Sequence, residues 1–432
     1  MIERDHQKKL SDKPFHERTL ADFVIQRREK PDIFAWTDDF YESLGYFADQ
    51  GYNFSRRVML TANNREVTIE DPVTGKPRTM IMMGSNSYLG LNDHPKVKEA
   101  AIKAVEKYGT GAGSPPHFSG YYDVHRELEK NLARLKGSED AIIYPSGYAT
   151  NVGILSCFLS PKDTIILDKL SHASIIDGAL LSGAKLTTFL HNNLESLERV
   201  LKKTMNNNGD RLVVVEGVYS MDGDIAPLDK IYELTQKYKA KLMVDEAHAT
   251  GVLGKTGRGS TEHYNLEGKI DLVMGTFSKS LGGIGGFVAA KKSVVEYMRY
   301  YSRAYLFAAS PTPPQVAAQN AALEILMNDS SHHKKLWENI KYFHGELKKN
   351  SFDIGNAETA ITPVVIGNSE KMRHVAKFMH ENNVFVNPVP YPAVAKKQDR
   401  LRLSVSAVHT KEDLKTVIET LKKANQKFPF TK

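Results

Sequence analysis

The sequence predicts an α/β fold in which a mostly parallel sheet is covered by helices on both faces. Short apolar runs recur along the chain, separated by helical stretches, and they cover residues 141–144, 164–167, 212–215, 241–244 and 271–274. Continuous apolar runs are typical of parallel strands that are buried on both faces. Each run is followed by a turn with polar side chains, and ligands bind beyond the carboxyl ends of the strands in such sheets. We therefore expect the functional residues in these turns.

The chain is long enough to bury a large core and to form more than one domain. It has 432 residues, of which 41% are hydrophobic and 25% are charged. Residues 1–83 are expected to form an N-terminal arm and a hairpin. We expect a large domain at residues 84–315 and a smaller α+β C-terminal domain at residues 316–432, which includes the helix that links the two.

The composition excludes several classes of protein. The single cysteine, Cys157, excludes a disulfide framework and a cysteine-rich zinc cluster, and no metal site is expected. No apolar run approaches the roughly 18 residues that span a bilayer, and no signal peptide is recognised. The net charge of +7 is spread along the chain, without the basic and aromatic stripe typical of nucleic-acid binding. We expect a cytoplasmic protein, for which peripheral contact with a membrane stays open.

A lysine in the turn after the last apolar run is the strongest candidate for a reactive group. Lys279 lies among hydroxyl groups and glycines in the segment 275–283. A lysine that loses contact with water can act as a neutral amine, which formation of a Schiff base requires. Thr276 and Ser278 could donate hydrogen bonds to a nearby phosphate. The alternative is an exposed lysine without a chemical role.

An aspartate closes another of the apolar runs. Asp245 follows residues 241–244, and a carboxylate at the end of a buried strand is costly unless it has a cationic partner. The protonated pyridine nitrogen of pyridoxal 5'-phosphate (PLP) is such a partner. The alternative is a cap on the following helix. Asp245 and Lys279 together predict a PLP site, and the turn 145–151 would add backbone amides that bind the phosphate.

Four segments together resemble the α-oxoamine synthases, and they cover residues 85–90, 168–174, 244–254 and 275–283. These fold-type I PLP enzymes condense an amino acid with an acyl thioester and release carbon dioxide. The resemblance implies an aspartate aminotransferase-like fold with a mostly parallel seven-stranded sheet, and a homodimer with shared active sites. Within the family, segments 175–178, 385–389 and 392–394 are similar to the soluble bacterial serine palmitoyltransferases.

The resemblance also implies a role for each matching residue. Lys279 would hold the cofactor and then remove the α-proton of the substrate, and Asp245 would pair with the pyridine nitrogen. His172 would stack on the ring and polarise the thioester carbonyl, although a histidine that caps a helix or fills the core is the alternative. The remaining cofactor contacts would come from Ser146, Gly147, Tyr148, Ser220, His248, Thr276, Ser278 and Ser310, the last of which would reach the partner subunit.

An arginine near the C-terminus matches the residue that binds the amino-acid carboxylate in this family. Arg402 is the matching position, and its planar fork suits a carboxylate. Arg400 lies two residues earlier and would share the same face of a strand, so that the choice between them stays open. A solvated charge at a strand edge is the alternative for either. Asn86 and His117 are the other expected substrate contacts.

The predicted reaction is a decarboxylating Claisen condensation of L-serine with a long-chain acyl thioester, which gives a 3-keto long-chain base. The acyl donor would be acyl-CoA or acyl carrier protein, which the positive net charge favours. Pro116 stands where an arginine is usual, and residues 117–121 instead resemble 8-amino-7-oxononanoate synthase. Alanine with a pimeloyl thioester, or cysteate with a long acyl chain as in sulfonolipid synthesis, are therefore alternatives. An aminotransferase, which would share Lys279 and Asp245, is the alternative from another class.

Overall fold

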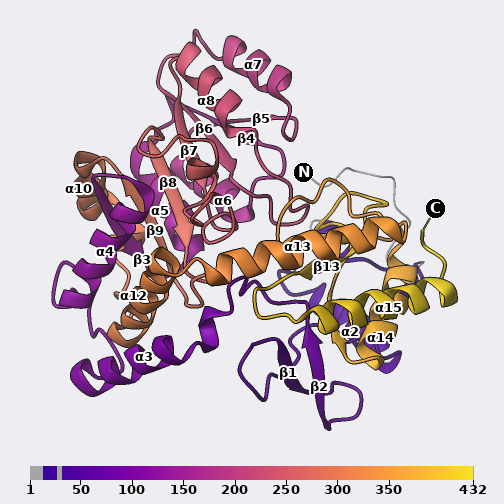
Figure 1. The fold of residues 1–432 in the computed structure, drawn as a ribbon. Coiled ribbons are helices and arrows are strands. Elements are labelled where there is room, and N and C mark those ends of the chain that lie inside the picture. Colours follow the sequence, from indigo (N-terminus) through magenta and orange to yellow (C-terminus); the bar gives the residue numbers. More distant parts are fainter. Residues whose placement is uncertain (1–12, 27–31, 432) are drawn as a thin grey trace.

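The computed structural model describes residues 13–26 and 32–431, and its centre is a seven-stranded sheet (Figure 1). The strand order is β3-β9-β8-β7-β6-β4-β5. The strands are β3 (Asp140–Tyr144), β4 (Thr164–Asp168), β5 (Lys185–Phe189), β6 (Arg211–Glu216), β7 (Lys241–Asp245), β8 (Leu272–Thr276) and β9 (Gly286–Ala290). All neighbouring pairs are parallel except those made by β9, which runs antiparallel to both β3 and β8. The predicted fold class is confirmed.

Helices cover both faces of this sheet because successive side chains of each strand point to opposite faces. In β6, Val213 and Val215 enter one apolar cluster and Val214 enters the other. One face packs on α4 (Asp123–Lys136), α7 (Leu194–Lys203), α8 (Leu228–Lys237) and α12 (Pro313–Asn328). The other face packs on α5 (Gly147–Phe158), α6 (Ala173–Ser182), α10 (Lys292–Tyr301) and α11 (Arg303–Leu306). The short helix η3 (Leu91–Asp93), α3 (Pro95–Tyr108) and α9 (Ser260–His263) complete this part.

Two small sheets lie beside the large one. The order of the first is β10-β13-β12, with β10 (Ile361–Val365), β13 (Arg400–Ser404) and β12 (Asn387–Val389), and all its pairs are antiparallel. The second pairs the predicted hairpin, β1 (Glu66–Glu70) and β2 (Pro77–Met82), with β11 (Val384–Phe385). Helices α13 (Ser331–Lys349), α14 (Ser369–Glu381) and α15 (Lys411–Lys427) lie on one side of them (Figure 1). The domain boundaries near residues 84 and 316 stay predictions.

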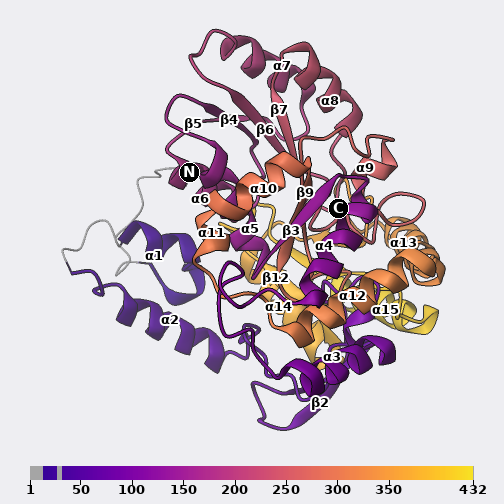
Figure 2. The ribbon, with the colours of Figure 1, turned by 90° about the vertical axis from the view of Figure 1, so that its left-hand side faces the viewer.

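The N-terminal segment forms η2 (Phe15–Glu17), α1 (Leu20–Gln26) and α2 (Thr37–Asp49). Figure 2 shows α1 and α2 side by side, away from the large sheet. The rings of Phe23 and Phe40 join the two helices, with centroids 5.1 Å apart. The rest of the predicted arm, residues 1–12 and 27–31, lies outside the described residues. Among the helices that the structure describes, none has the length and apolar character needed to cross a membrane.

Candidate active site

A cavity of about 290 Å³ lies at the carboxyl ends of β6, β7 and β8. In a parallel sheet, the turns that follow the strands all lie at the same edge. Residues that are distant in the sequence therefore meet there. The sequence-predicted residues that line the cavity are Ser146, Gly147, Tyr148, His172, Asp245, His248, Thr276, Ser278 and Lys279. Asn151, Ser174 and Glu216 line it as well, and none of these three was assigned a role from the sequence.

The carboxylate of Asp245 is buried at the end of β7, with 4% of the residue exposed. It accepts hydrogen bonds from Nδ2 of Asn151 and from the backbone amide of Ala247, both at 2.9 Å. Burial raises the pKa of Asp245, and these hydrogen bonds act in the opposite direction. Both donors are neutral, so that a cation in the cavity would complete the environment of this carboxylate. The pyridinium nitrogen of PLP fits that requirement.

Lys279 is half-buried on the cavity wall, which excludes the exposed alternative. Burial lowers the pKa of its amine, with Asp245 and Glu216 acting in the opposite direction. The turn that holds it needs glycine, because Gly282 has φ +66° and a side chain there would come within 2.5 Å of the backbone nitrogen of Asn92. The backbone therefore presents a partly desolvated amine to the cavity, as a Schiff-base lysine requires.

The first turn of α5 forms a cradle suited to a phosphate. Ser146 caps this helix, since its hydroxyl accepts from the amide of Ala149 at 3.0 Å. The amides of Gly147 and Tyr148 begin the helix, where the backbone N–H groups have no partner within the helix. Opposite them, the hydroxyl oxygens of Thr276 and Ser278 lie 2.9 Å apart. Amides at a helix N-terminus together with hydroxyls match the phosphate of PLP.

His172 caps the helix α6 and also lines the cavity. The alternative interpretation of His172 as a helix cap is therefore correct in part. Its Nδ1 accepts from the backbone amide of Ser174 at 3.2 Å, at the start of α6. Because an amide can only donate, the neutral ring carries its proton on Nε2. The backbone amide of His172 donates to Oε1 of Glu216 at 2.6 Å. Burial raises the pKa of Glu216 well above its ordinary value, with Asp245 acting in the same direction.

A chain of hydrogen bonds connects His248 to Arg402. Tyr88 lies between them, with its hydroxyl 2.7 Å from Nδ1 of His248 and 3.3 Å from Oδ1 of Asn86. Nη1 of Arg402 donates to the same oxygen of Asn86 at 3.0 Å. Burial lowers the pKa of His248 well below its ordinary value and raises that of Tyr88 to about 12, so that both are neutral. No role was assigned to Tyr88 from the sequence, because an aromatic residue next to a leucine is typical of a hydrophobic core.

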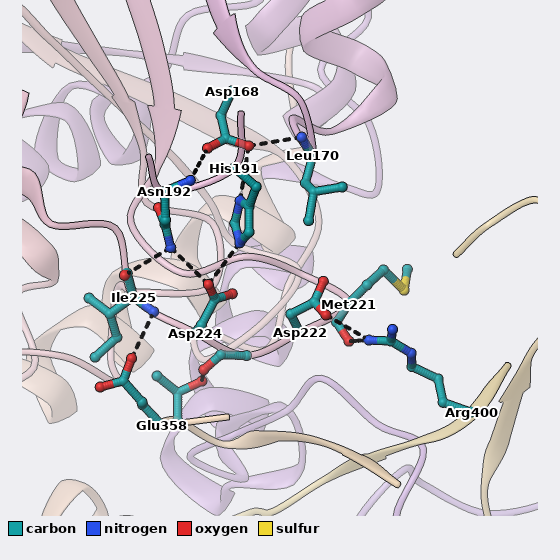
Figure 3. Close-up of polar contacts among 12 residues, drawn as sticks. Asp168, Leu170, His191, Asn192, Met221, Asp222, Asp224, Ile225, Glu358 and Arg400 are labelled. Carbon is teal, nitrogen blue, oxygen red and sulfur yellow. Dashed lines mark hydrogen bonds and ion pairs between the residues drawn. The ribbon is translucent and has the colours of Figure 1, made fainter. Parts of the chain in front are cut away.

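The two arginines of β13 have different partners, although they share one face of the strand. Nη1 of Arg400 donates to Oδ1 of Asp222 at 2.8 Å and to the carbonyl of Met221 at 3.0 Å (Figure 3). Nε of Arg402 donates to the carbonyl of Ser220 at 2.7 Å. With 4% and 6% of their surfaces exposed, neither arginine is the solvated charge of the alternative interpretation. Arg400 already has a carboxylate partner, which argues against the substrate role considered for it.

Three further predicted residues lie outside the cavity. Nε2 of His117 lies 2.7 Å from the carbonyl of Arg299, and its ring packs on Tyr300; its contact with the substrate stays a prediction. Ser220 contributes its backbone carbonyl to Arg402 and does not line the cavity. The buried hydroxyl of Ser310 has no hydrogen-bond partner among the described residues. The prediction that Ser310 reaches a second subunit concerns the dimer and stays a prediction.

Comparison with known proteins agrees with this geometry. The family model for aminotransferase class I and II matches residues 78–421. The 8-amino-7-oxononanoate synthase of Thermoanaerobacter pseudethanolicus is 42% identical over 84% of this chain and 93% of that protein. The 8-amino-7-oxononanoate synthase of Alkaliphilus metalliredigens is 44% identical over 81% of this chain and 88% of that protein. A serine palmitoyltransferase from S. paucimobilis, solved with bound PLP, has a TM-score of 0.87 and 33% identity, covering 92% of this chain and 99% of that chain.

The fold and the cavity define a PLP-dependent enzyme of fold-type I. The chain belongs to the α-oxoamine synthase family, within aminotransferase class I and II. The predicted family, cofactor and reaction class are thereby confirmed. Its reaction is the PLP-dependent condensation of an amino acid with an acyl thioester.

Proposed function

We propose that this enzyme condenses L-alanine with a pimeloyl thioester, with loss of carbon dioxide, to form 8-amino-7-oxononanoate. The observation that carries the proposal is the identity of 42% and 44% to synthases of that name, over 84% and 81% of this chain. The segment 117–121 favours the same product, because it resembles the corresponding stretch of those synthases. This revises the expectation that serine is the amino acid.

Some residues of the cavity would hold the cofactor, and Lys279 would in addition accept a proton. Bound PLP supplies an electron sink for negative charge at the α-carbon of the amino acid. The carboxylate of Asp245 holds the pyridine nitrogen protonated, and the amides of Gly147 and Tyr148 with the hydroxyl of Thr276 hold the phosphate. The amine of Lys279 would attach the cofactor and, once the amino acid has taken its place, would accept the α-proton. Burial lowers the pKa of this amine, which favours the neutral form that a general base needs.

Two further residues orient the substrates. Arg402 binds the carboxylate of the amino acid with the help of Asn86, which its Nη1 already contacts at 3.0 Å. The Nε2–H group of His172 donates a hydrogen bond to the thioester carbonyl oxygen, which stabilises the negative charge that develops there. The thiol leaves as the new carbon–carbon bond forms, and carbon dioxide leaves before the product is released. Ser310 completes the phosphate site of a second copy, which makes the active unit a homodimer.

A second candidate is the condensation of serine with a long-chain acyl thioester. The observation that favours it is the fold, since the TM-score of 0.87 to the serine palmitoyltransferase extends over 92% of this chain. Cysteate with a long acyl chain would use the same residues. In each case the acyl carrier is coenzyme A or a carrier protein, and both are anionic, which suits the net charge of +7. A cytoplasmic location remains part of the proposal.

The amino acid can be identified by competition. The holoenzyme is given alanine, serine and cysteate with pimeloyl-CoA or palmitoyl-CoA, and products are separated by mass spectrometry. We expect 8-amino-7-oxononanoate as the main product, with kcat/KM for alanine about 10- to 100-fold above that for serine, the range in which an apolar pocket discriminates against an added hydroxyl. A dominant 3-keto long-chain base would contradict the proposal and establish the second candidate.

A further inference from the structure

A histidine outside the cavity lies between two carboxylates. His191 follows β5, and its Nδ1 is 3.0 Å from Oδ1 of Asp168, while its Nε2 is 2.8 Å from Oδ2 of Asp224 (Figure 3). Both carboxylates are buried, with 1% and 5% of the residues exposed. Carboxylate oxygens only accept hydrogen bonds, so that both ring nitrogens donate and the ring carries a positive charge. The proposed reaction uses none of these groups.

The surroundings of this cluster support the charged ring. Burial alone would lower the pKa of His191, but the hydrogen bonds to Asp168 and Asp224 raise it to about 10. The ring of Tyr219 packs edge-on against the imidazole, with centroids 4.4 Å apart. Two further titratable residues, Lys348 and Glu358, line a neighbouring hollow of about 490 Å³ together with His191. On the other side, Glu216 and the hydroxyl of Tyr219 interact with Asp168.

Asp224, which His191 contacts, belongs to a turn that follows β6. In this turn, residues 217–225, the amide of Tyr219 donates to the carbonyl of Asp224 at 3.1 Å, and the amide of Gly223 donates to the carbonyl of Tyr219 at 2.9 Å. The hydroxyl of Thr359 donates to the carbonyl of Gly223 at 2.9 Å. Gly223 has φ +71°, and a side chain there would come within 2.2 Å of the carbonyl oxygen of Ile361. The turn is thus held between His191 and the segment 359–361.

The turn 217–225 also contacts the two arginines of β13. Asp222 pairs with Arg400 at 2.8 Å (Figure 3). The carbonyl of Ser220 accepts from Nε of Arg402 at 2.7 Å. Asp224, which His191 holds, is four residues from Ser220 in the same short turn. A displacement of Asp224 therefore moves the carbonyl that orients Arg402.

We propose that His191 is a positioning residue that, through Asp224 and the turn 217–225, orients Arg402 for the carboxylate of the amino-acid substrate. The inference rests on the proposed role of Arg402. His191 acts only through the turn, so that its loss should weaken binding of the amino acid more than it slows the chemical steps.

The test compares holoenzymes of the wild type and of His191→Gln, with His263→Gln as the matched control at an exposed position. His191→Gln leaves two buried carboxylates without their cation, and we expect KM for the amino acid to rise roughly 10- to 100-fold with kcat changed less than about threefold. The visible absorbance of the bound cofactor should be retained. In the double variant His191→Gln with Asp224→Asn, a neutral hydrogen bond replaces the ion pair at Asp224, while Asp168 keeps its hydrogen bonds from the backbone amides of Leu170 and Asn192. This variant should recover most of the lost affinity.

The outcomes separate this inference from the proposed function. If Arg402→Lys raises KM for the amino acid but His191→Gln leaves it within about threefold of the wild type, the positioning role is wrong and the role of Arg402 stands. If Arg402→Lys has no effect on KM, the assignment of Arg402 itself fails. Should His191→Gln lower only the unfolding temperature, or should the double variant keep the raised KM, His191 has no positioning role.

The charge on His191 also predicts the direction of a pH effect. Its pKa is raised from about 6.5 to about 10 in the folded protein, so that its stabilisation is complete below about pH 6.5 and is lost as the pH rises to about 10. The difference in unfolding temperature between the wild type and the double variant should therefore shrink over this range. A difference that is constant from pH 6 to pH 10 would show that the ring is not charged.

Discussion

Replacement of Lys279 by alanine is expected to reduce the rate of condensation by at least about 10⁴-fold. Loss of a positioned general base alone costs about 10²- to 10⁴-fold, and this variant also loses the amine that attaches the cofactor. The rate is measured from release of free thiol. Attachment of the cofactor is measured by mass spectrometry after reduction with borohydride, which adds the mass of the reduced cofactor to the wild type only.

Lys241→Ala is the matched control for this experiment. Lys241 begins β7 at the opposite end of the sheet, where it pairs with Asp271 at 2.8 Å and is largely exposed. It should keep both activity and the attached cofactor. If Lys279→Ala kept the covalent cofactor, another lysine would hold PLP and the assignment of the cavity would be wrong.

Replacement of Asp245 by asparagine is expected to lower kcat/KM by about 10²- to 10⁴-fold. Removal of one partner of a buried ion pair costs about 3–5 kcal/mol, and 1.4 kcal/mol is a factor of ten. Asparagine has nearly the same shape, but its single side-chain oxygen can accept from only one of Asn151 and the amide of Ala247, so that the change removes the negative charge and one hydrogen bond. The cofactor should bind more weakly, which is measured by titration of the apoenzyme with PLP.

Asp229→Asn makes the same chemical change on the exposed side of α8, beside Lys230, and should leave kcat/KM and the affinity for PLP unchanged. An Asp245→Asn variant with nearly full activity would show that the pyridine nitrogen does not depend on this carboxylate. The role assigned to the end of β7 would then have to be abandoned.

In the large sheet, the strands that could be predicted are buried on both faces and consist of a continuous apolar run. The five apolar runs correspond to β3, β4, β6, β7 and β8. β5 was missed because it lies at the edge of the sheet and most of its side chains are exposed, so that it has no apolar run. β9 was missed because glycine and alanine make up most of it, and residues of low β-propensity give no strand signal.

The parts of the site that could be predicted are those carried by short segments after these strands. Lys279 and Asp245 were found in this way, since each closes an apolar run. Contacts between distant segments could not be predicted, because neither hydrophobic periodicity nor a motif reports them. The ion pair that distinguishes Arg400 from Arg402 joins residues 178 positions apart. His191 likewise meets Asp168 and Asp224 only once β4, β5 and the turn 217–225 are assembled.

The balance of products from a single reaction tests the central claim most directly. The holoenzyme is incubated with carboxyl-labelled alanine and pimeloyl-CoA, and labelled carbon dioxide, free thiol and pyruvate are measured together. A decarboxylating condensation predicts carbon dioxide and thiol in equal amounts, without pyruvate. Pyruvate without release of thiol or carbon dioxide would instead show transamination, and would contradict the assignment of this chain as a synthase.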